Sequence, residues 1–228
     1  MAVAVDDIET ITFDSFTTLV DVLGSTDRVL RQYVDDPDPI VTRWRTRAVE
    51  YRMLCNFVGA YEPYQRTTRQ ALKYALAVHD VELSEETIDA VANVFRQLDV
   101  FGDVADSFEQ LDDAGYDLYI VSNGEPELLD AIVERADVDD HVIDTISADE
   151  IEIYKPDAAI YQHASNRTDT PLENVVHVAT PWYDVFGAMN AGMQAVWVNR
   201  QDLPWETYDG EPDLIVDDLF EFVAAFDE

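Results

Sequence analysis

The sequence of 228 residues contains one cysteine, two lysines and no apolar run long enough to cross a membrane. Because Cys55 stands alone, an intramolecular disulfide is excluded, and no Cys/His cluster has the spacing of a zinc site. We expect Cys55 to be an inert core residue, since free cysteine is often buried. A membrane span needs about 18 successive apolar residues, and the acidic N-terminus lacks a signal-peptide pattern. These absences predict a soluble, cytoplasmic protein without a membrane partner.

Positive charge is also scarce. Lys and Arg total 14 against 48 Asp and Glu, which gives a net charge of −34, and the only lysines are Lys73 and Lys155. A small domain normally carries a net charge of about 2–8, so this chain repels itself at low ionic strength. At about 1 M salt the Debye length falls to about 3 Å. The balance predicts a high-salt cytoplasm and argues against nucleic acid as a partner. An acidic interaction surface is the alternative, and it is less favoured because the acids are spread along the whole chain.

Alternating strand and helix patterns predict a parallel sheet with right-handed crossovers. The strands are expected at residues 10–14, 117–122, 141–147, 174–179, 194–199 and 213–216, and the helices at 103–114, 126–136, 156–166 and 183–191. Between the first two strands, residues 21–98 contain no convincing strand. Helices are expected there at 40–61 and 63–78, and Ser84 is expected to cap a third.

An insert of this length is too long for a simple crossover. The fold class is therefore α/β, a Rossmann-like parallel sheet core with a helical cap domain inserted after the first strand. We expect residues 1–20 and 99–228 to form the core and residues 21–98 to form the cap.

Asp14 follows the first predicted strand directly, at the sheet edge where open α/β folds bind ligands. A carboxylate there can act as a covalent nucleophile. The strand predicted at 117–122 ends in Ser122 and Asn123, just before a helix whose backbone amides form an anion site. Both residues are also common helix caps. Gly124 is expected to make a turn that lets the backbone approach a ligand.

Two further segments place polar side chains near the same edge. Lys155 stands beside a helix start in a chain that has almost no lysine, and a lysine suits lowering the pKa of a nearby carboxylate. Tyr161 follows six residues later and could equally be a core tyrosine. Asp184 lies in the first turn of a helix, where the helix dipole also favours an acid. His177 is expected to be a core or edge histidine.

These segments resemble, in order and spacing, the L-2-haloacid dehalogenases of the haloacid dehalogenase superfamily. The Asp14-x-x-x-Thr18 pattern and the Lys155-Pro156 pair are shared across that superfamily. Its phosphatases usually have Asp two residues after the nucleophile and its dehalogenases an aromatic residue, which here is Phe16. Trp44-Arg45 followed by Glu50-Tyr51 is similar to the dehalogenase cap-helix motif.

The resemblance implies hydrolytic dehalogenation of short L-2-haloacids. Asp14 would displace halide and form an ester, which water would then hydrolyse. Arg45 and Asn123 would stabilise the departing halide, and Ser122 with nearby amides would hold the substrate carboxylate.

Four more roles and one wider expectation come from the same comparison. Lys155 would keep Asp14 ionised and Thr18 would orient it, while Tyr161 and Asp184 would position Lys155 and the water. A homodimer is expected by analogy, since family members are often dimers.

The sequence departs from the family at Thr17, where the family has glycine, and at Ala179 and Pro181, where the family often has Ser and Asn. Tyr183 replaces a common Trp. Because Ala179 stands where the metal-dependent phosphatases have an acid, no metal and no cofactor are expected. Two alternatives stay open: a Mg²⁺-dependent phosphatase of the superfamily, and a catalytically silent binding protein of the same fold.

Overall fold

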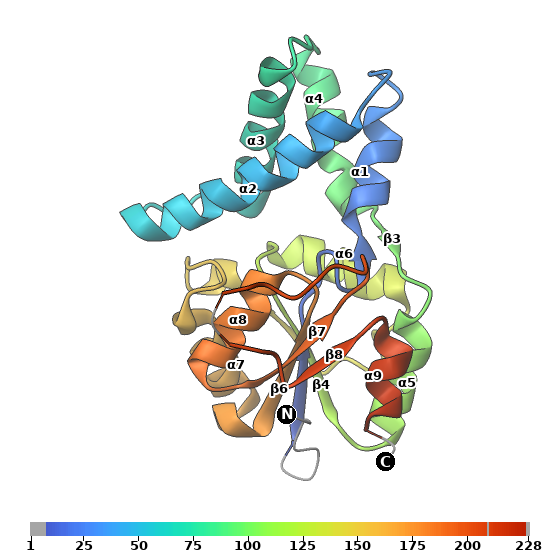
Figure 1. The fold of residues 1–228 in the computed structure, drawn as a ribbon, viewed down its shortest axis with the longest axis vertical. Coiled ribbons are helices and arrows are strands. Elements are labelled where there is room, and N and C mark those ends of the chain that lie inside the picture. Colours follow the sequence, from blue (N-terminus) through green and yellow to red (C-terminus); the bar gives the residue numbers. More distant parts are fainter. Residues whose placement is uncertain (1–7, 209, 227–228) are drawn as a thin grey trace.

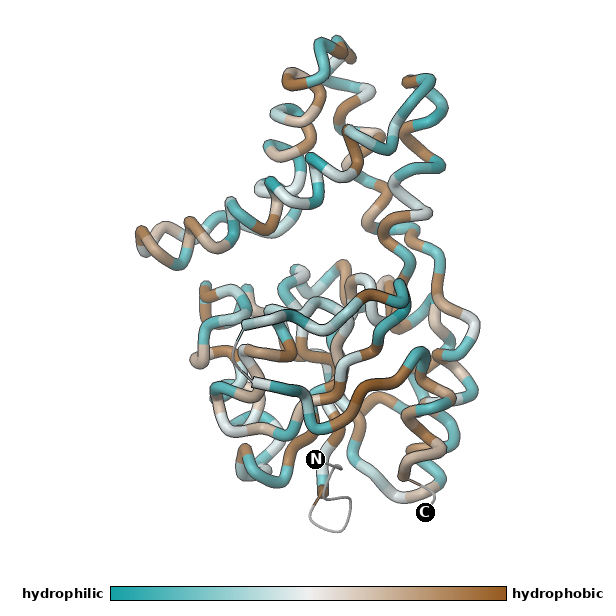
Figure 2. The backbone as a smooth tube through the Cα atoms, viewed as in Figure 1, coloured by the Kyte–Doolittle hydropathy of each residue, from teal (hydrophilic) through white to brown (hydrophobic). Residues whose placement is uncertain are grey.

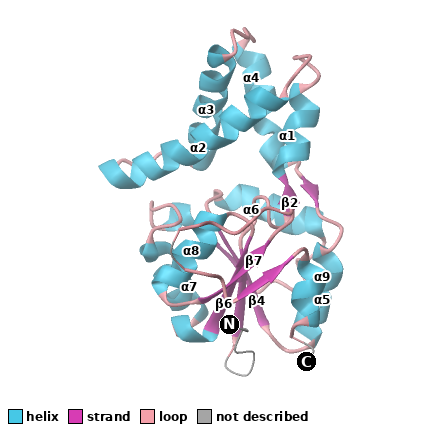
Figure 3. Cartoon of the chain, in the orientation of Figure 1, coloured by secondary structure: helices cyan, strands magenta, loops and turns pink. Residues whose placement is uncertain are grey.

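A six-stranded parallel sheet forms the centre of the molecule in the computed structural model, which describes residues 8–208 and 210–226. The strand order is β5-β4-β1-β6-β7-β8, with bounds β5 Asp144–Ser147, β4 Asp117–Ser122, β1 Thr10–Phe13, β6 Val175–Ala179, β7 Gln194–Val198 and β8 Leu214–Val216. Every neighbouring pair is parallel. The predicted α/β parallel sheet is confirmed (Figures 1 and 3).

The central strands are buried on both faces, as a parallel sheet covered by helices requires. One apolar cluster packs β1 and its neighbours against α5 (Val104–Asp113) and α9 (Leu219–Ala224). The other lies against α6 (Pro126–Ala136), α7 (Ala158–Thr168) and α8 (Trp182–Ala191). Figure 2 shows hydrophobic residues concentrated along the strands of the sheet.

A second layer contains α1 (Val22–Leu30), α2 (Asp38–Val58), α3 (Tyr64–Val78) and α4 (Glu85–Ala92), followed by the short 3-10 helix η2 (Asn93–Arg96). These helices lie together at one end of the molecule, beyond the carboxyl ends of the strands (Figure 1). Two short antiparallel strands, β2 (Val20–Asp21) and β3 (Asp99–Val100), join this layer to the sheet. The layer is amphipathic, since hydrophilic and hydrophobic residues alternate along its helices (Figure 2).

The apolar cluster that lies against α6, α7 and α8 continues into the helical layer, where it includes Trp44. This side chain is fully buried, and its indole Nε1 donates to the Thr68 carbonyl at 2.7 Å, which ties α2 to α3. Cys55 is only partly buried and packs against the cluster from its margin, so the prediction of a core cysteine was wrong. Within the described chain, none of the helices combines the length and apolar character that a membrane span needs.

Element ends differ from the predictions for local reasons. The helix predicted at 156–166 begins at Ala158, because the Asp157 side chain accepts a hydrogen bond from the Ala159 amide and caps it. The helix predicted at 40–61 ends at Val58, because Gly59 adopts a left-handed conformation with φ +64°. Ser84 caps α4 as predicted, accepting from the Thr87 amide.

Candidate active site

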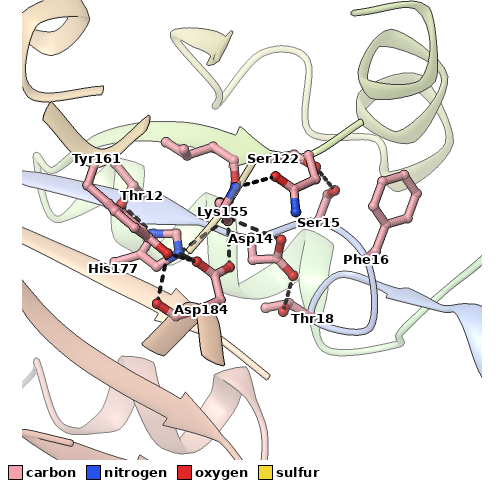
Figure 4. Close-up of polar contacts among 12 residues, drawn as sticks. Thr12, Asp14, Ser15, Phe16, Thr18, Ser122, Lys155, Tyr161, His177 and Asp184 are labelled. Carbon is pink, nitrogen blue, oxygen red and sulfur yellow. Dashed lines mark hydrogen bonds and ion pairs between the residues drawn. The ribbon is translucent and has the colours of Figure 1, made fainter. Parts of the chain in front are cut away.

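Side chains from four segments converge at the carboxyl ends of the strands (Figure 4). Asp14 follows β1, Ser122 ends β4, Lys155 lies in the loop after β5, and Asp184 lies in the first turn of α8 after β6. Because β1 sits between β4 and β6 in the sheet, Asp14 is central and the others surround it. The order of the strands therefore explains why residues distant in sequence meet here.

Lys155 lies at the centre of the cluster. Its buried ammonium Nζ lies 3.2 Å from Asp14 Oδ1, 2.7 Å from Asp184 Oδ2 and 2.6 Å from the Val121 carbonyl oxygen. These three acceptors match the three N–H donors of an ammonium group. One cation thus pairs with both carboxylates and holds them on either side of itself.

Asp14 is 5% exposed, and its two oxygens have different partners. Oδ1 faces Lys155, and Oδ2 accepts a hydrogen bond from Thr18 Oγ1 at 2.9 Å. Burial raises the pKa of Asp14 above its ordinary value; the charge of Lys155 opposes this rise, and the charge of Asp184 adds to it. Lys155 is therefore the main group that favours the ionised, nucleophilic form.

Asp184 is held by two further side chains. Tyr161 donates its hydroxyl to Asp184 Oδ1 at 2.6 Å, and His177 Nε2 lies 3.2 Å from the same oxygen. Burial alone would raise the pKa of Asp184, but Lys155 and His177 outweigh it, so the pKa lies well below its usual range. Asp184 is therefore an anion that fixes Lys155 in place.

His177 is fully buried, which confirms the prediction of a core histidine, and it belongs to the polar cluster as well. Its Nδ1 is 2.8 Å from Thr12 Oγ1, and its Nε2 is 3.4 Å from Lys155 Nζ. Since the three Lys155 donors already have acceptors, we infer that Nε2 carries the hydrogen and donates to Asp184. The sequence alone did not assign His177 to the site.

Ser122 and Asn123 have different positions. The Ser122 hydroxyl is fully buried, lies 2.6 Å from Ser15 Oγ and accepts from the Gly124 amide. Asn123 lines the cavity beside Asp14, and its Oδ1 accepts from the Lys155 backbone amide at 2.8 Å. Its Nδ2 group is the part of the amide that remains to donate to a bound anion.

The absence of a side chain at Gly124 leaves room for two neighbouring side chains. A Cβ at this position would lie 2.9 Å from Phe16 Cε2 and 3.1 Å from a Leu129 methyl carbon. The Phe16 ring in turn stacks on Tyr64 from the helical layer, with centroids 4.7 Å apart and planes 8° apart. A side chain at position 124 would therefore displace the Phe16 ring, which lines the same cavity as Asp14.

The Asp14 carboxylate faces a small inner cavity of about 20 Å³, which is room for about one water molecule. Its walls come from both layers, and the lining residues are Asp14, Phe16, Arg45, Arg52, Tyr64, Asn123, Lys155, Pro181, Tyr183 and Asp184. Arg45, to which the resemblance assigns the halide, is one of the lining residues. Arg52, also on α2, was not anticipated.

An outer pocket of about 290 Å³ adjoins this cavity. Arg45, Pro181 and Tyr183 line both, so they form the wall between the two spaces. Aromatic and apolar side chains such as Trp182 and Leu203 make up much of the outer lining. The outer pocket therefore lies next to the cavity that Asp14 lines.

The departures from the family pattern have structural consequences. Thr17 adopts φ +72°, a left-handed conformation that is uncommon for a β-branched residue. Pro181 lines the inner cavity and offers no side-chain hydrogen bond, while Ala179 is fully buried. Across the part of the chain that the structure describes, no group of three or more His, Cys, Asp or Glu side chains is arranged to hold a metal ion.

Comparison with known proteins supports one family. A family model for haloacid dehalogenase-like hydrolases matches residues 8–192. The (S)-2-haloacid dehalogenase 4A of Burkholderia cepacia is 31% identical over 202 residues, which cover 89% of this chain and 87% of that protein. The (S)-2-haloacid dehalogenase of Pseudomonas putida is 29% identical over 214 residues, covering 94% of each chain.

Solved structures agree with the sequence matches. The L-2-haloacid dehalogenase of Xanthobacter autotrophicus with chloropropionic acid covalently bound superposes with a TM-score of 0.87 at 27% identity, covering 95% of this chain and 97% of that one. The resemblance that the motifs suggested is therefore confirmed. Because the family model spans most of its length, this chain belongs to the haloacid dehalogenase-like hydrolases.

Proposed function

We propose that this protein hydrolyses short L-2-haloacids to 2-hydroxy acids through a covalent ester on Asp14. One observation carries the proposal: a buried carboxylate, bound by Lys155 and Thr18, faces a cavity lined by an aromatic residue, arginines and an amide. A nucleophile beside groups that stabilise a leaving anion is what halide displacement requires. Relatives named (S)-2-haloacid dehalogenases support the same activity.

In the first step, a carboxylate oxygen of Asp14 attacks C2 of the haloacid from the side opposite the halogen. The carbon–halogen bond breaks, the halide leaves with the bonding electrons, and C2 is inverted. Arg45 and the amide of Asn123 stabilise the developing halide charge. Ser122, whose hydroxyl contacts Ser15 and Gly124, holds the substrate carboxylate together with nearby backbone amides.

In the second step, water attacks the carbonyl carbon of the Asp14 ester, and the alkoxide leaves as the 2-hydroxy acid after protonation. The bond between C2 and its oxygen is untouched here, so an L substrate gives a D product. Lys155 favours the returning carboxylate, Thr18 orients it, and Tyr161 and Asp184 hold Lys155.

Residues 21–98 act as a cap over Asp14 in this proposal. The inner cavity holds about one water molecule, so a haloacid can enter only if side chains or the helical layer move. Closure would then exclude bulk water and strengthen the electrostatic contacts at Asp14.

The proposal also includes the salt concentration of the cytoplasm and the oligomeric state. The net charge of −34 suits a high-salt cytoplasm and argues against nucleic acid as a partner. A homodimer is supported by the C-terminal end of α2, where Leu54, Phe57 and Val58 are exposed, Phe57 by 87%. Light scattering in high salt checks the dimer, and a monomeric mass contradicts it.

The test is halide release from each enantiomer of 2-chloropropionate, in a high-salt buffer without chloride. We expect release from the L form and none from the Asp14→Asn variant. A single burst of halide equal to the enzyme concentration indicates that the ester forms but is not hydrolysed. The missing hydrogen-bonding side chains at Ala179 and Pro181 would then be the first explanation to test. No release, combined with Mg²⁺-dependent phosphate release from phosphate esters, contradicts the proposal.

A further inference from the structure

The loop that carries Lys155 is bound by a side chain from the helical layer. Tyr154, the residue before Lys155, is fully buried and lies in neither a helix nor a strand. Asn56, in the last turn of α2, donates from Nδ2 to the Tyr154 carbonyl at 2.7 Å, and its Oδ1 accepts from the Tyr154 amide at 3.0 Å. One amide side chain thus binds both backbone polar groups of Tyr154, as a neighbouring strand of a sheet would.

Further contacts bind the same segment from both sides. The Tyr154 hydroxyl donates to the Glu62 carbonyl at 2.6 Å, in the turn between α2 and α3. From the sheet side, Asn123 Oδ1 accepts from the Lys155 amide at 2.8 Å. Within the loop, the Asp157 amide donates to the Tyr154 carbonyl at 3.2 Å. This backbone is therefore held between one asparagine from each layer.

The position of this backbone affects the charge that Lys155 presents to Asp14. Lys155 Nζ lies 3.2 Å from Asp14 Oδ1, and both residues are almost completely buried. At an effective dielectric constant of about 20, a retreat of Nζ by about 1 Å weakens the attraction by about a quarter, which corresponds to about one unit in the pKa of Asp14. A displacement too small to unfold the protein therefore changes the fraction of Asp14 that is ionised.

The contact between Asn56 and Tyr154 depends on the helical layer lying against the sheet, since its two partners belong to different layers. The helical layer joins the sheet through β2 and β3, and the C-terminal end of α2 lies on the opposite side of that layer from this connection (Figure 1). A rotation of the layer about the connection therefore moves this end of α2 the furthest. If the layer rotates to admit substrate to the inner cavity, the contact breaks, and closure restores it.

We propose that Asn56 is a positioning residue, which places Lys155 against Asp14 when the helical layer closes. The inference rests on the proposed function, because it takes Asp14 as the nucleophile whose ionisation matters. Before closure the Tyr154 backbone lacks its Asn56 partner, and Asp14 is ionised to a smaller extent. After closure Lys155 holds Asp14 as the anion that attacks. The nucleophile is thus activated in the closed site, from which bulk water is excluded.

The first experiment measures the pKa of Asp14 without turnover. Its carboxyl carbon is followed by carbon-13 NMR during a pH titration in high salt, and the resonance is assigned as the one missing from the Asp14→Asn protein. Because the charge of Lys155 lowers the pKa of Asp14, Asn56→Ala should raise that pKa by about one unit. The matched control is Glu125→Ala, since Glu125 Oε2 accepts from the Gln65 amide at 2.8 Å and joins the same two layers away from Tyr154. This control should leave the pKa of Asp14 within about 0.2 units of the wild-type value.

The measured shift is specific because Asn56 is uncharged. Its removal changes the pKa of Asp14 only by moving the charged and titratable groups that face Asp14. These groups are Lys155, Asp184, His177, Tyr161, Arg45, Arg52, Tyr64 and Tyr183. Arg45, Arg52 and Tyr64 move with the helical layer as a whole, and Glu125→Ala loosens that layer as well. An equal shift in both variants therefore overturns the inference.

Initial rates of bromide release from L-2-bromopropionate supply the second readout. The acidic limb of kcat/KM should move up by about one pH unit in Asn56→Ala and stay in place in Glu125→Ala. An unchanged pKa of Asp14 in Asn56→Ala overturns the inference. If Asn56→Ala does not fold, Asn56→Leu, which is close to asparagine in shape and makes neither hydrogen bond, decides by the same criteria. A shifted pKa of Asp14 in a protein that releases no halide would contradict the proposed reaction while supporting the positioning role of Asn56.

Discussion

Replacing Lys155 by methionine tests the charge network at the centre of the site. At 3.2 Å and an effective dielectric constant of about 20, the attraction between Lys155 and Asp14 is about 5 kcal/mol before desolvation is counted. Removing one partner of a buried pair costs about 3–5 kcal/mol, because the other charge is left uncompensated. Here two carboxylates, Asp14 and Asp184, lose their shared cation. We therefore expect the free energy of unfolding at pH 7 to fall by about 3–5 kcal/mol.

The pH dependence of this loss follows from the directions of the two pKa shifts. The pKa of Asp14 is already raised in the folded protein, and removing Lys155 raises it further, so the folded variant gains stability as pH falls and Asp14 is protonated. Asp184 has a lowered pKa in the folded wild type. Its contribution to the free energy of unfolding is therefore present above the pKa of the unfolded chain, about 4, and is lost as the pH falls below that value. Between pH 5 and pH 7 only the Asp14 effect operates, because the Asp184 contribution is intact at both, and it makes the difference in stability between wild type and variant smaller at pH 5 than at pH 7.

Urea unfolding at pH 5 and pH 7, together with initial rates of bromide release from 2-bromopropionate, measures both quantities. The variant should be at least about 100-fold slower at pH 7, and its residual rate should rise about tenfold per pH unit as Asp14 ionises. Lys73→Met is the matched control, since Lys73 is the other lysine, is 43% exposed and pairs with Glu85 on the surface. If Lys155→Met is as stable and active as Lys73→Met, or if its deficit grows at pH 5, the reasoning is wrong.

Three further predictions concern separate parts of the site. Tyr161→Phe removes a hydrogen-bond donor to Asp184 and should lower kcat about tenfold. KM should not change, because Tyr161 does not line the cavity, and a rise in KM in steady-state kinetics would contradict this. Thr17→Gly should raise the unfolding free energy by up to about 1 kcal/mol, since relief of the left-handed strain exceeds the entropy cost of glycine; destabilisation in urea would contradict this. Chloride should inhibit competitively, so replacing it with sulfate at equal ionic strength should raise the rate at low substrate; equal rates would remove the case for halide binding in the cavity.

The sheet was predictable because its strands are short apolar runs that end in turn or polar residues. The segments at 117–122, 174–179 and 194–199 were placed within one residue of their observed bounds. Helix α1 was not predicted, since Val22–Leu30 contains Gly24, Ser25 and Thr26, which are weak helix formers. It forms because Asp21 caps it and because its apolar residues pack into the helical layer.

The site was predictable where a residue stands at the end of a strand and only partly predictable elsewhere. Asp14 follows from position alone, because parallel strands deliver their carboxyl ends to one edge. Lys155 was singled out by the scarcity of lysine beside a helix start, and Asp184 by its place in the first turn of a helix. Arg52 was missed because arginine is rarely buried without a partner, so a helical arginine is expected on the solvent face. Its spacing of seven residues from Arg45 was the available signal. The role of His177 depends on contacts across the sheet, which sequence does not contain.

The most direct test of covalent catalysis by Asp14 follows the oxygen atoms through a single turnover. Enzyme in molar excess over L-2-chloropropionate is allowed to react in water labelled with heavy oxygen, in high salt without chloride. If Asp14 forms the ester and water attacks its carbonyl carbon, the label enters the peptide that contains Asp14, and the hydroxyl oxygen of the product is unlabelled. Label in the product hydroxyl with none in the peptide would show that water attacks C2 directly, and it would contradict the assignment of Asp14 as the nucleophile.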